Sequence, residues 1–428
     1  MSDWRLHTPI GLSDILPEEC EKKKEVENII NDVFVSMGYR EIETPAFEYY
    51  DVFSGGSGQI SQENMFKFFD EKGRILTLRP DITTSIARVA ATKLQDENLP
   101  IRLCYTGNVF RAEKTEGVRQ REFTQSGIEL LGSDTPNADA EVITAAIEAL
   151  FAVGISDFQV EIGQVAFFNG LVEQAGLDEN LTEKLRDRID SKDSVGIKLI
   201  TDKLDIPDEI KNLMIELPYL FGDMSVIKKA DVSGLNETSK AALDNLKRIY
   251  ELLCLYGFEK YISFDLGIIA NFDYYSGIIF HGYTYGTGNP IAKGGRYDNL
   301  TGIFGMPSVS GVGISFGADR IYDVLTELNL YPENLQSTTQ LLFATFGEQE
   351  LLYSLGWAKV LRAKGVCVEV YPEPTKMKKQ MGYADAKNIP YVAIVGGDEM
   401  AAGKVMLKNM LSGEQKLVDV EECLATIC

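Results

Sequence analysis

The segment at residues 331–339 most restricts how this chain of 428 residues can fold. It lacks the apolar periodicity of a helix or a strand, and it contains Pro332, Asn334, Gln336, Ser337, Thr338 and Thr339. Because such a segment contributes little to a hydrophobic core, it is typical of a connection between domains. We therefore predict a linker at 331–339, a first domain at 1–330 and a second domain at 340–428.

Strands and helices alternate in the predicted second domain. Strands are expected at 341–346, 366–371 and 391–395 and as a pair within 405–418, with helices at 349–364 and 377–387. Because a crossover helix returns the chain to the next parallel strand, this order predicts a small α/β sheet.

The first domain has a different order of elements. We expect helices at 18–37, 82–94, 139–151 and 317–328, and strands at 40–44, 74–78, 101–105, 122–132, 158–162, 261–269, 274–285 and 311–316. Between residues 178 and 245 the charges are dense and the apolar residues recur at helical spacing. This pattern predicts a small helical insertion within the first domain.

The net charge limits the partners that the chain can attract. It carries 42 Lys and Arg against 64 Asp and Glu, a formal charge of −22. A field of this sign repels phosphate backbones and anionic lipids, so unspecific binding to nucleic acids or membrane surfaces is disfavoured. The sequence has no run of about 18 apolar residues, which a membrane span would need. We expect a cytoplasmic protein.

The cysteines and histidines do not predict a metal site. The six cysteines are scattered without a C-x-x-C pair, and the only histidines are His7 and His281. Zinc sites and disulfide frameworks both need closer clustering of these residues. We therefore expect reduced thiols, no bound metal and no cofactor.

Asp81 lies where a predicted strand ends and a predicted helix begins. Its carboxylate can accept hydrogen bonds from the ammonium group of a ligand. It can equally cap the helix by accepting from a backbone N–H group, and position alone favours neither interpretation.

Basic residues are concentrated between two predicted strands, at Arg111, Lys114, Arg119 and Arg121. Arg111 and Arg121 have the bidentate guanidinium groups that suit phosphate. Charge counting alone nevertheless favours a solvated loop.

Tyrosines and glycines mark two further stretches. Tyr274 and Tyr275, at a strand edge, together with a turn at Gly294 and Gly295, are expected to form a polar pocket wall. The glycines at 311–317 match a dinucleotide fingerprint only loosely and lack its β-α-β context, which disfavours a nicotinamide cofactor.

Taken in order, these stretches resemble the class II aminoacyl-tRNA synthetases, and among them histidyl-tRNA synthetase. The segments that carry the resemblance are 11–17, the helix and strand up to Pro45, Arg111 with its loop, 274–277, 294–298 and Asp319-Arg320. The resemblance implies an α+β fold: an antiparallel sheet flanked by helices, the helical insertion and a C-terminal α/β domain similar to anticodon-binding domains. The motif-1-like segment further implies a homodimer.

The resemblance also implies a histidine pocket and a phosphate site. The expected histidine-binding residues are Asp81, Thr83, Arg111, Gln125, Glu129, Tyr274 and Tyr275, and the expected nucleotide or phosphate contacts are Arg111, Glu113, Arg121 and Arg320.

One departure from the synthetase decides our interpretation. The synthetase signature Arg-Gly-Leu-Asp-Tyr-Tyr-Thr-Gly corresponds to residues 270–277 here, and its catalytic arginine falls on Ala270. Losing a preorganised charged donor of this kind costs on the order of 10²–10³-fold in rate. Lys114-Thr115-Glu116 also replaces a synthetase-like Arg-Pro-Gln. The chain therefore resembles a protein that holds histidine without activating it.

That combination is similar to the regulatory subunits of ATP phosphoribosyltransferase. The resemblance implies a non-catalytic protein that binds L-histidine as a feedback signal and assembles with a short-form catalytic subunit, in the first step of histidine biosynthesis.

Two alternatives stay open from the sequence. A histidine–tRNA ligase with a relocated arginine is favoured by the anticodon-binding-like domain, which many regulatory subunits lack. However, residues 341–428 contain 10 Lys and Arg against 11 Asp and Glu, without the basic surplus of an RNA-binding face. A stand-alone amino-acid or nucleotide binding module is the other alternative.

Overall fold

The computed structural model describes residues 3–54, 62–112, 120–268, 275–305, 309–331 and 339–427. The chain divides into two compact units, Met1–Leu330 and Tyr331–Cys428.

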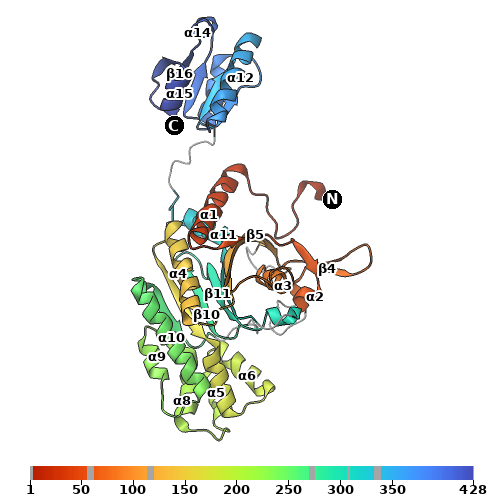
Figure 1. The fold of residues 1–428 in the computed structure, drawn as a ribbon, viewed down its shortest axis with the longest axis vertical. Helices are drawn as coiled ribbons and strands as arrows, with labels where there is room; N and C mark the ends of the chain where they lie inside the picture. The colour runs from red at the N-terminus through yellow and green to blue at the C-terminus, as the bar shows by residue number, and fades with distance from the viewer. Residues whose placement is uncertain are drawn as a thin grey trace. The chain divides into compact units, whose positions relative to one another are not determined.

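A nine-stranded sheet forms the centre of the first unit, in the order β1-β5-β6-β12-β11-β10-β7-β9-β8 (Figure 1). The strands are β1 (Arg40–Glu41), β5 (Ile101–Phe110), β6 (Glu122–Leu131), β7 (Phe158–Gln164), β8 (Phe221–Gly222), β9 (Ile262–Asp265), β10 (Ile278–Thr284), β11 (Ala292–Tyr297) and β12 (Gly311–Gly317). Neighbouring strands are antiparallel except β1 with β5 and β7 with β9. The predicted antiparallel sheet is confirmed at its centre, and the sheet as a whole is mixed.

Long helices cover one side of this sheet. Helix α1 (Pro17–Ser36) buries Val26, Ile30 and Phe34, which recur at helical spacing, and Gly38 follows it with a φ of +87°. This left-handed residue ends the helix as predicted. Helix α4 (Pro136–Ala152) is rich in buried alanine and packs against β6, β11 and β12. Helix α11 (Ala318–Glu327) follows β12 and contacts both α1 and β6.

A second sheet in the first unit has three strands. Its order is β2-β4-β3, with β2 at Phe47–Tyr49, β3 at Lys67–Phe69 and β4 at Ile75–Leu78. The short α2 (Asp51–Ser54) follows β2, and α3 (Thr83–Lys93) follows β4. Because β4 ends just before α3 begins, Asp81 lies in the connection between the two elements.

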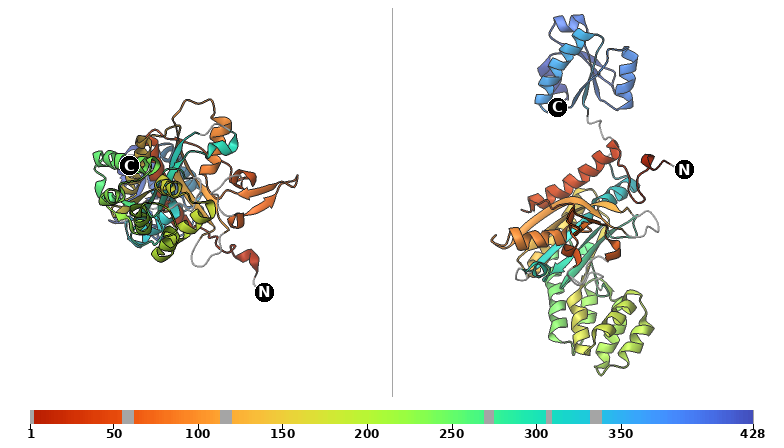
Figure 2. Two further views of the ribbon diagram at one scale, coloured as in Figure 1. Left: turned by 90° about the horizontal axis from the view of Figure 1, so that it is seen from below. Right: turned by 90° about the vertical axis from the view of Figure 1, so that its right-hand side faces the viewer.

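Helices make up the predicted insertion. They are α6 (Glu179–Asp190), α7 (Ser194–Thr201), α8 (Asp208–Glu216) and α9 (Ser225–Ala230), flanked by α5 (Val165–Ala175) and α10 (Glu237–Leu255). These helices gather at one end of the first unit (Figure 2). The insertion also supplies β8, which pairs with β9 at the edge of the sheet.

The second unit contains a five-stranded sheet in the order β14-β13-β15-β16-β17. The strands are β13 (Leu341–Ala344), β14 (Val368–Val370), β15 (Tyr391–Ile394), β16 (Val405–Asn409) and β17 (Gln415–Val418), and the helices are α12 (Glu348–Ala363), α13 (Met377–Ala386), α14 (Gly397–Ala401) and α15 (Val420–Ile427). β13 is parallel to β14 and β15. The predicted α/β sheet is confirmed, and the short helices α14 and α15 were not predicted.

The expected turn at Gly294 and Gly295 is wrong, because both residues lie in the middle of β11. A Cβ atom at Gly294 would be 2.3 Å from the carbonyl oxygen of Gly313, and one at Gly295 would be 2.7 Å from the carbonyl oxygen of Ile278. These glycines therefore permit close approach between neighbouring backbones, the other common use of glycine within a strand.

No helix in the described part of the chain combines the length and the apolarity that crossing a membrane would require.

Candidate functional site: an amino-acid-sized cavity on the central sheet

A cavity of about 130 Å³ lies in the first unit, between the central strands β6, β11 and β12 and the beginnings of α3 and α11. It brings together residues that are far apart in the sequence. The predicted site residues that line it are Asp81, Thr83, Arg111, Gln125, Glu129, Tyr275 and Arg320.

Glu129 is the buried acidic group of this cavity, with 1% of its surface exposed. The Thr83 hydroxyl donates to its Oε1 at 2.6 Å, the Tyr105 hydroxyl donates to the same oxygen at 3.4 Å, and the Tyr297 hydroxyl donates to Oε2. Burial raises the pKa of Glu129 from its ordinary value of 4.5 to about 7, despite these donors. The group therefore changes charge near neutral pH.

Glycines create the space that Glu129 occupies. A Cβ atom at Gly313, which is opposite Glu129 in the sheet, would be 1.8 Å from its Oε2. A Cβ atom at Gly127 would be 2.6 Å from the Tyr105 hydroxyl oxygen, and one at Gly295 would be 2.7 Å from ring carbons of Tyr275. The glycine-rich stretch at 311–317 thus accommodates side chains and is not a nucleotide loop.

Asp81 both lines the cavity and caps α3. Its Oδ1 accepts a hydrogen bond from the backbone N–H of Thr84 at 2.8 Å. Burial raises the pKa of this half-buried carboxyl group above its ordinary value. The two interpretations of Asp81 are therefore compatible, because Oδ1 caps the helix while the carboxyl group also lines the cavity.

Two of the predicted phosphate contacts, Arg111 and Arg320, line the cavity. Arg111 donates from Nε to the Pro80 carbonyl at 3.2 Å and lies over the Phe123 ring. Arg320 donates from Nη1 to the Pro290 carbonyl at 2.8 Å. Backbone carbonyls thus hold both guanidinium groups at the cavity wall.

The structure does not place Arg121 in the cavity lining. Its side chain packs instead against Gly11, whose φ is +81° and whose added Cβ would be 2.8 Å from Cγ of Arg121. The predicted positions Ala270, Tyr274 and Glu113 lie outside the described residues.

Asp319 lies behind the cavity wall. It forms an ion pair with Lys23 of α1 at 2.8 Å and accepts a hydrogen bond from the backbone N–H of Thr124. Of the pair Asp319-Arg320, the carboxylate therefore ties α1 to β6, and only the arginine lines the cavity.

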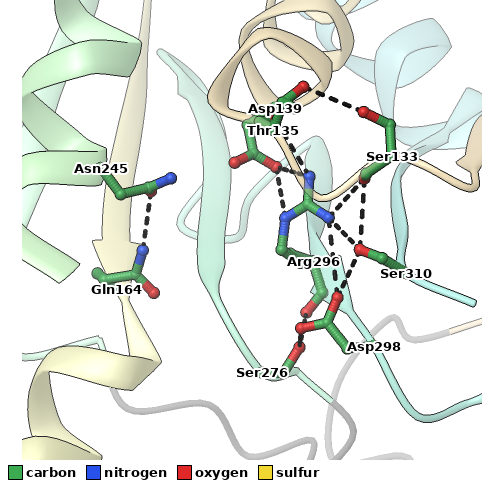
Figure 3. A network of polar contacts seen from close by, with 9 residues as sticks. All are labelled: Ser133, Thr135, Asp139, Gln164, Asn245, Ser276, Arg296, Asp298 and Ser310. Atoms are coloured by element: carbon green, nitrogen blue, oxygen red, sulfur yellow. Dashed lines mark hydrogen bonds and ion pairs between the residues drawn. The ribbon is translucent and has the colours of Figure 1, made fainter. Parts of the chain in front are cut away.

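The opposite face of β11 has a structural role. Arg296, 6% exposed, donates from Nε and Nη2 to Oδ1 of Asp139 in α4 at 2.9 and 2.6 Å, and from Nη1 to the Ser133 carbonyl at 2.8 Å (Figure 3). Burial raises the pKa of Asp139 to about 6, although Arg296 lowers it. Ser310 joins this network by donating to Asp298 at 2.6 Å.

Sequence reasoning missed several cavity residues, among them Lys293, Tyr297 and Ser315. Each of the three lies in β11 or β12, on the strand face that points toward the cavity. The two-residue repeat 293, 295, 297 could have indicated them, but Gly294-Gly295 was interpreted as a turn.

The buried carboxyl group predicts a pH-dependent stability. The folded state holds a proton on Glu129 up to about pH 7, whereas the unfolded state releases it near pH 4.5. The stabilising contribution is therefore complete below pH 4.5 and lost as the pH rises through 7. We expect the unfolding free energy of wild type to fall between pH 5 and pH 8 by about 3 kcal/mol more than that of Glu129→Gln, at 1.36 kcal/mol per pKa unit. Urea titrations at both pH values measure this difference. If the unfolding free energies of wild type and Glu129→Gln change equally between the two pH values, the prediction is contradicted.

Known proteins share this fold. A family model described as histidyl-tRNA synthetase matches residues 11–321, and one described as an anticodon binding domain matches residues 340–427. The solved histidyl-tRNA synthetase of Nostoc superposes with a TM-score of 0.82 at 25% identity, covering 98% of both chains. The family match and the fold thus define a protein of the histidyl-tRNA synthetase type.

More similar relatives have another name. A protein of Acetivibrio thermocellus named ATP phosphoribosyltransferase regulatory subunit is 43% identical over 99% of this chain and 100% of its own length. A Bacillus halodurans structure described as an ATP phosphoribosyltransferase regulatory subunit/histidyl-tRNA synthetase has a TM-score of 0.79 at 31% identity, covering 92% of this chain and 100% of its own. The chain belongs to the ATP phosphoribosyltransferase regulatory subunit family.

Proposed function

We propose that this protein is a non-catalytic regulatory and activating subunit of ATP phosphoribosyltransferase that binds L-histidine in the cavity. The observation that carries the proposal is a retained amino-acid cavity in a chain whose sequence has Ala270 where the synthetases that it resembles have an arginine. The names of the relatives support the same role. We further propose that it acts in the cytoplasm, with a short-form catalytic subunit as its partner.

The cavity offers matching chemistry for each polar part of histidine. The Asp81 carboxyl group lines the cavity and can accept a hydrogen bond from an ammonium group, and Glu129 is a buried group that can exchange a proton with an imidazole ring. Bound histidine would change the contacts with the catalytic subunit, and such coupling is typically worth about 1–3 kcal/mol and is reciprocal.

Calorimetry and enzyme assays test both parts of the proposal. We expect L-histidine to bind with a dissociation constant below millimolar, and Asp81→Asn to weaken binding about tenfold or more by removing a charged hydrogen-bond acceptor. Mixing with a short-form catalytic subunit should raise phosphoribosyl-ATP synthesis, and histidine should reverse the effect. An absence of heat at millimolar histidine would remove the sensing role, and an absence of activation would remove the partner.

We also propose that the protein forms a homodimer through its smaller sheet. Phe47 and Phe69 expose 52% and 72% of their surfaces there, and the Phe47 ring contacts that of Phe68. Exposed aromatic clusters of this kind mark interfaces. A monomer in sedimentation velocity at micromolar concentration would rule out this proposal.

A histidine–tRNA ligase is the second candidate, favoured by the match of residues 340–427 to an anticodon-binding domain. Histidine-dependent ATP–pyrophosphate exchange discriminates between the two. We expect none from wild type, and exchange at ordinary synthetase rates would establish the ligase instead. Ala270→Arg should produce measurable exchange if the arginine side chain is the only group that the wild type lacks.

A further inference from the structure

A second cavity, of about 120 Å³, lies next to the cavity described above, which is called the first cavity from here on. Phe123 lines both cavities, but Glu122 and Thr124 line only the second and Gln125 lines only the first. Because successive residues of a strand point to opposite faces, the two cavities lie on opposite faces of β6. The second cavity is therefore separate from the site proposed for histidine.

Hydrogen bonds fix two carboxylates in the wall of the second cavity. Thr124 Oγ1 donates to Asn108 Oδ1 at 2.9 Å, and Asn108 Nδ2 donates to Glu122 Oε1 at 2.8 Å. The backbone N–H of Thr124 donates to Oδ2 of Asp319. Both carboxylates therefore hold defined positions before a ligand arrives, and such preorganisation lowers the entropy cost of binding.

Only one of these two carboxylates has a cation beside it. Lys23 of α1 and Asp319, whose side chains are each 13% exposed, form an ion pair at 2.8 Å. Glu122 has Asn108 as its hydrogen-bond partner, and no lysine or arginine in the described ranges lies within ion-pair distance of it. The charged residues that line the cavity are thus Lys23, Asp319 and Glu122, one positive and two negative. A ligand with a single positive charge makes this lining neutral.

We propose that the second cavity binds the ammonium group of a small organic amine, with Glu122 as its charged acceptor. An ammonium group has three donors, and the Ser13 hydroxyl and the Gln120 amide oxygen, which also line the cavity, can accept the other two. Ile15 and Phe123 supply apolar surface for an alkyl chain. A single water molecule needs roughly 10–15 Å³ of such space, so the cavity has room for this chain as well. The proposal does not depend on histidine binding.

A charged probe and its neutral analogue test this site. n-Butylammonium and butan-1-ol are titrated separately into the full chain and followed by saturation-transfer NMR. We expect wild type to bind butylammonium with a millimolar dissociation constant and butan-1-ol at least about tenfold more weakly, because only the amine is charged. Glu122→Gln should weaken butylammonium binding about tenfold while its amide oxygen still accepts from Asn108. Glu97→Gln, which removes an exposed carboxylate of the same unit, is the matched control and should bind like wild type.

The variant Asp81→Asn detects binding in the wrong cavity. If it abolishes butylammonium binding and Glu122→Gln does not, the amine is held in the first cavity and the proposal is overturned. Three other results also overturn it: wild type binds neither probe, wild type binds both probes equally, or Glu122→Gln binds butylammonium no more weakly than Glu97→Gln does. Histidine calorimetry on wild type tests the proposed function separately in each case.

Discussion

Replacement of Arg296 by methionine is expected to lower the free energy of unfolding by about 3–5 kcal/mol, because it leaves a buried carboxylate without its partner. Asp139 is fully buried, and its Oδ1 accepts two hydrogen bonds from Arg296. Removal of the guanidinium also takes one hydrogen bond from the Ser133 carbonyl and one from the Ser310 hydroxyl. Urea unfolding followed by circular dichroism measures the loss.

A second ion pair in the same unit provides the matched control. Arg102 donates to Glu141 of α4 at 2.7 and 2.8 Å, but the two side chains are 33% and 25% exposed. Arg102→Met should therefore cost only about 1 kcal/mol, as is typical of solvated pairs. The double variant Arg296→Met/Asp139→Asn should recover part of the loss by removing the buried charge. Equal costs for Arg296→Met and Arg102→Met would show that burial does not govern the Arg296 network.

Substitution of Gly313 by alanine is expected to weaken histidine binding about a hundredfold, the effect of losing two charged hydrogen bonds. The new methyl group would be 1.8 Å from Oε2 of Glu129 and 2.7 Å from the Ile128 carbonyl oxygen. Glu129 must then leave its position between Thr83 and Tyr297, and the cavity loses its buried acidic group. Calorimetry gives the affinity, and thermal unfolding shows that the variant is folded.

Gly288→Ala is the appropriate comparison, because Gly288 belongs to the same unit and an added Cβ there meets no atom within 4 Å. It should bind histidine like wild type. If Gly313→Ala is folded and also binds like wild type, Glu129 does not contact the ligand.

The sequence was sufficient to predict the fold where one pattern had one physical meaning. The apolar spacing in α1 and the alternation of strands and helices after residue 340 predicted the observed elements. The resemblance to the synthetases led to the cavity, because Asp81, Arg111, Gln125, Glu129 and Arg320 converge there only after folding.

Elsewhere a residue type had two physical uses, and sequence reasoning selected the wrong one. Gly294-Gly295 is a common turn pair, yet in β11 the glycines allow three strands to approach closely around Tyr275 and Phe280. Lys293 was overlooked for the same reason, since its orientation depends on a strand that had not been predicted. The position of Arg121 against Gly11 depends on a contact between segments more than a hundred residues apart.

Alternate residues of strand β11 have different roles, because successive side chains point to opposite faces of the sheet. Lys293, Gly295 and Tyr297 face the cavity, whereas Arg296 between them anchors α4 on the other side. A one-residue slip of β11 in its sheet register would exchange these two faces, turning Lys293 toward the α4 side and Arg296 toward the cavity. The register of β11 is therefore constrained from both of its faces at once, so a slip of this strand would disturb the cavity and the anchoring of α4 together.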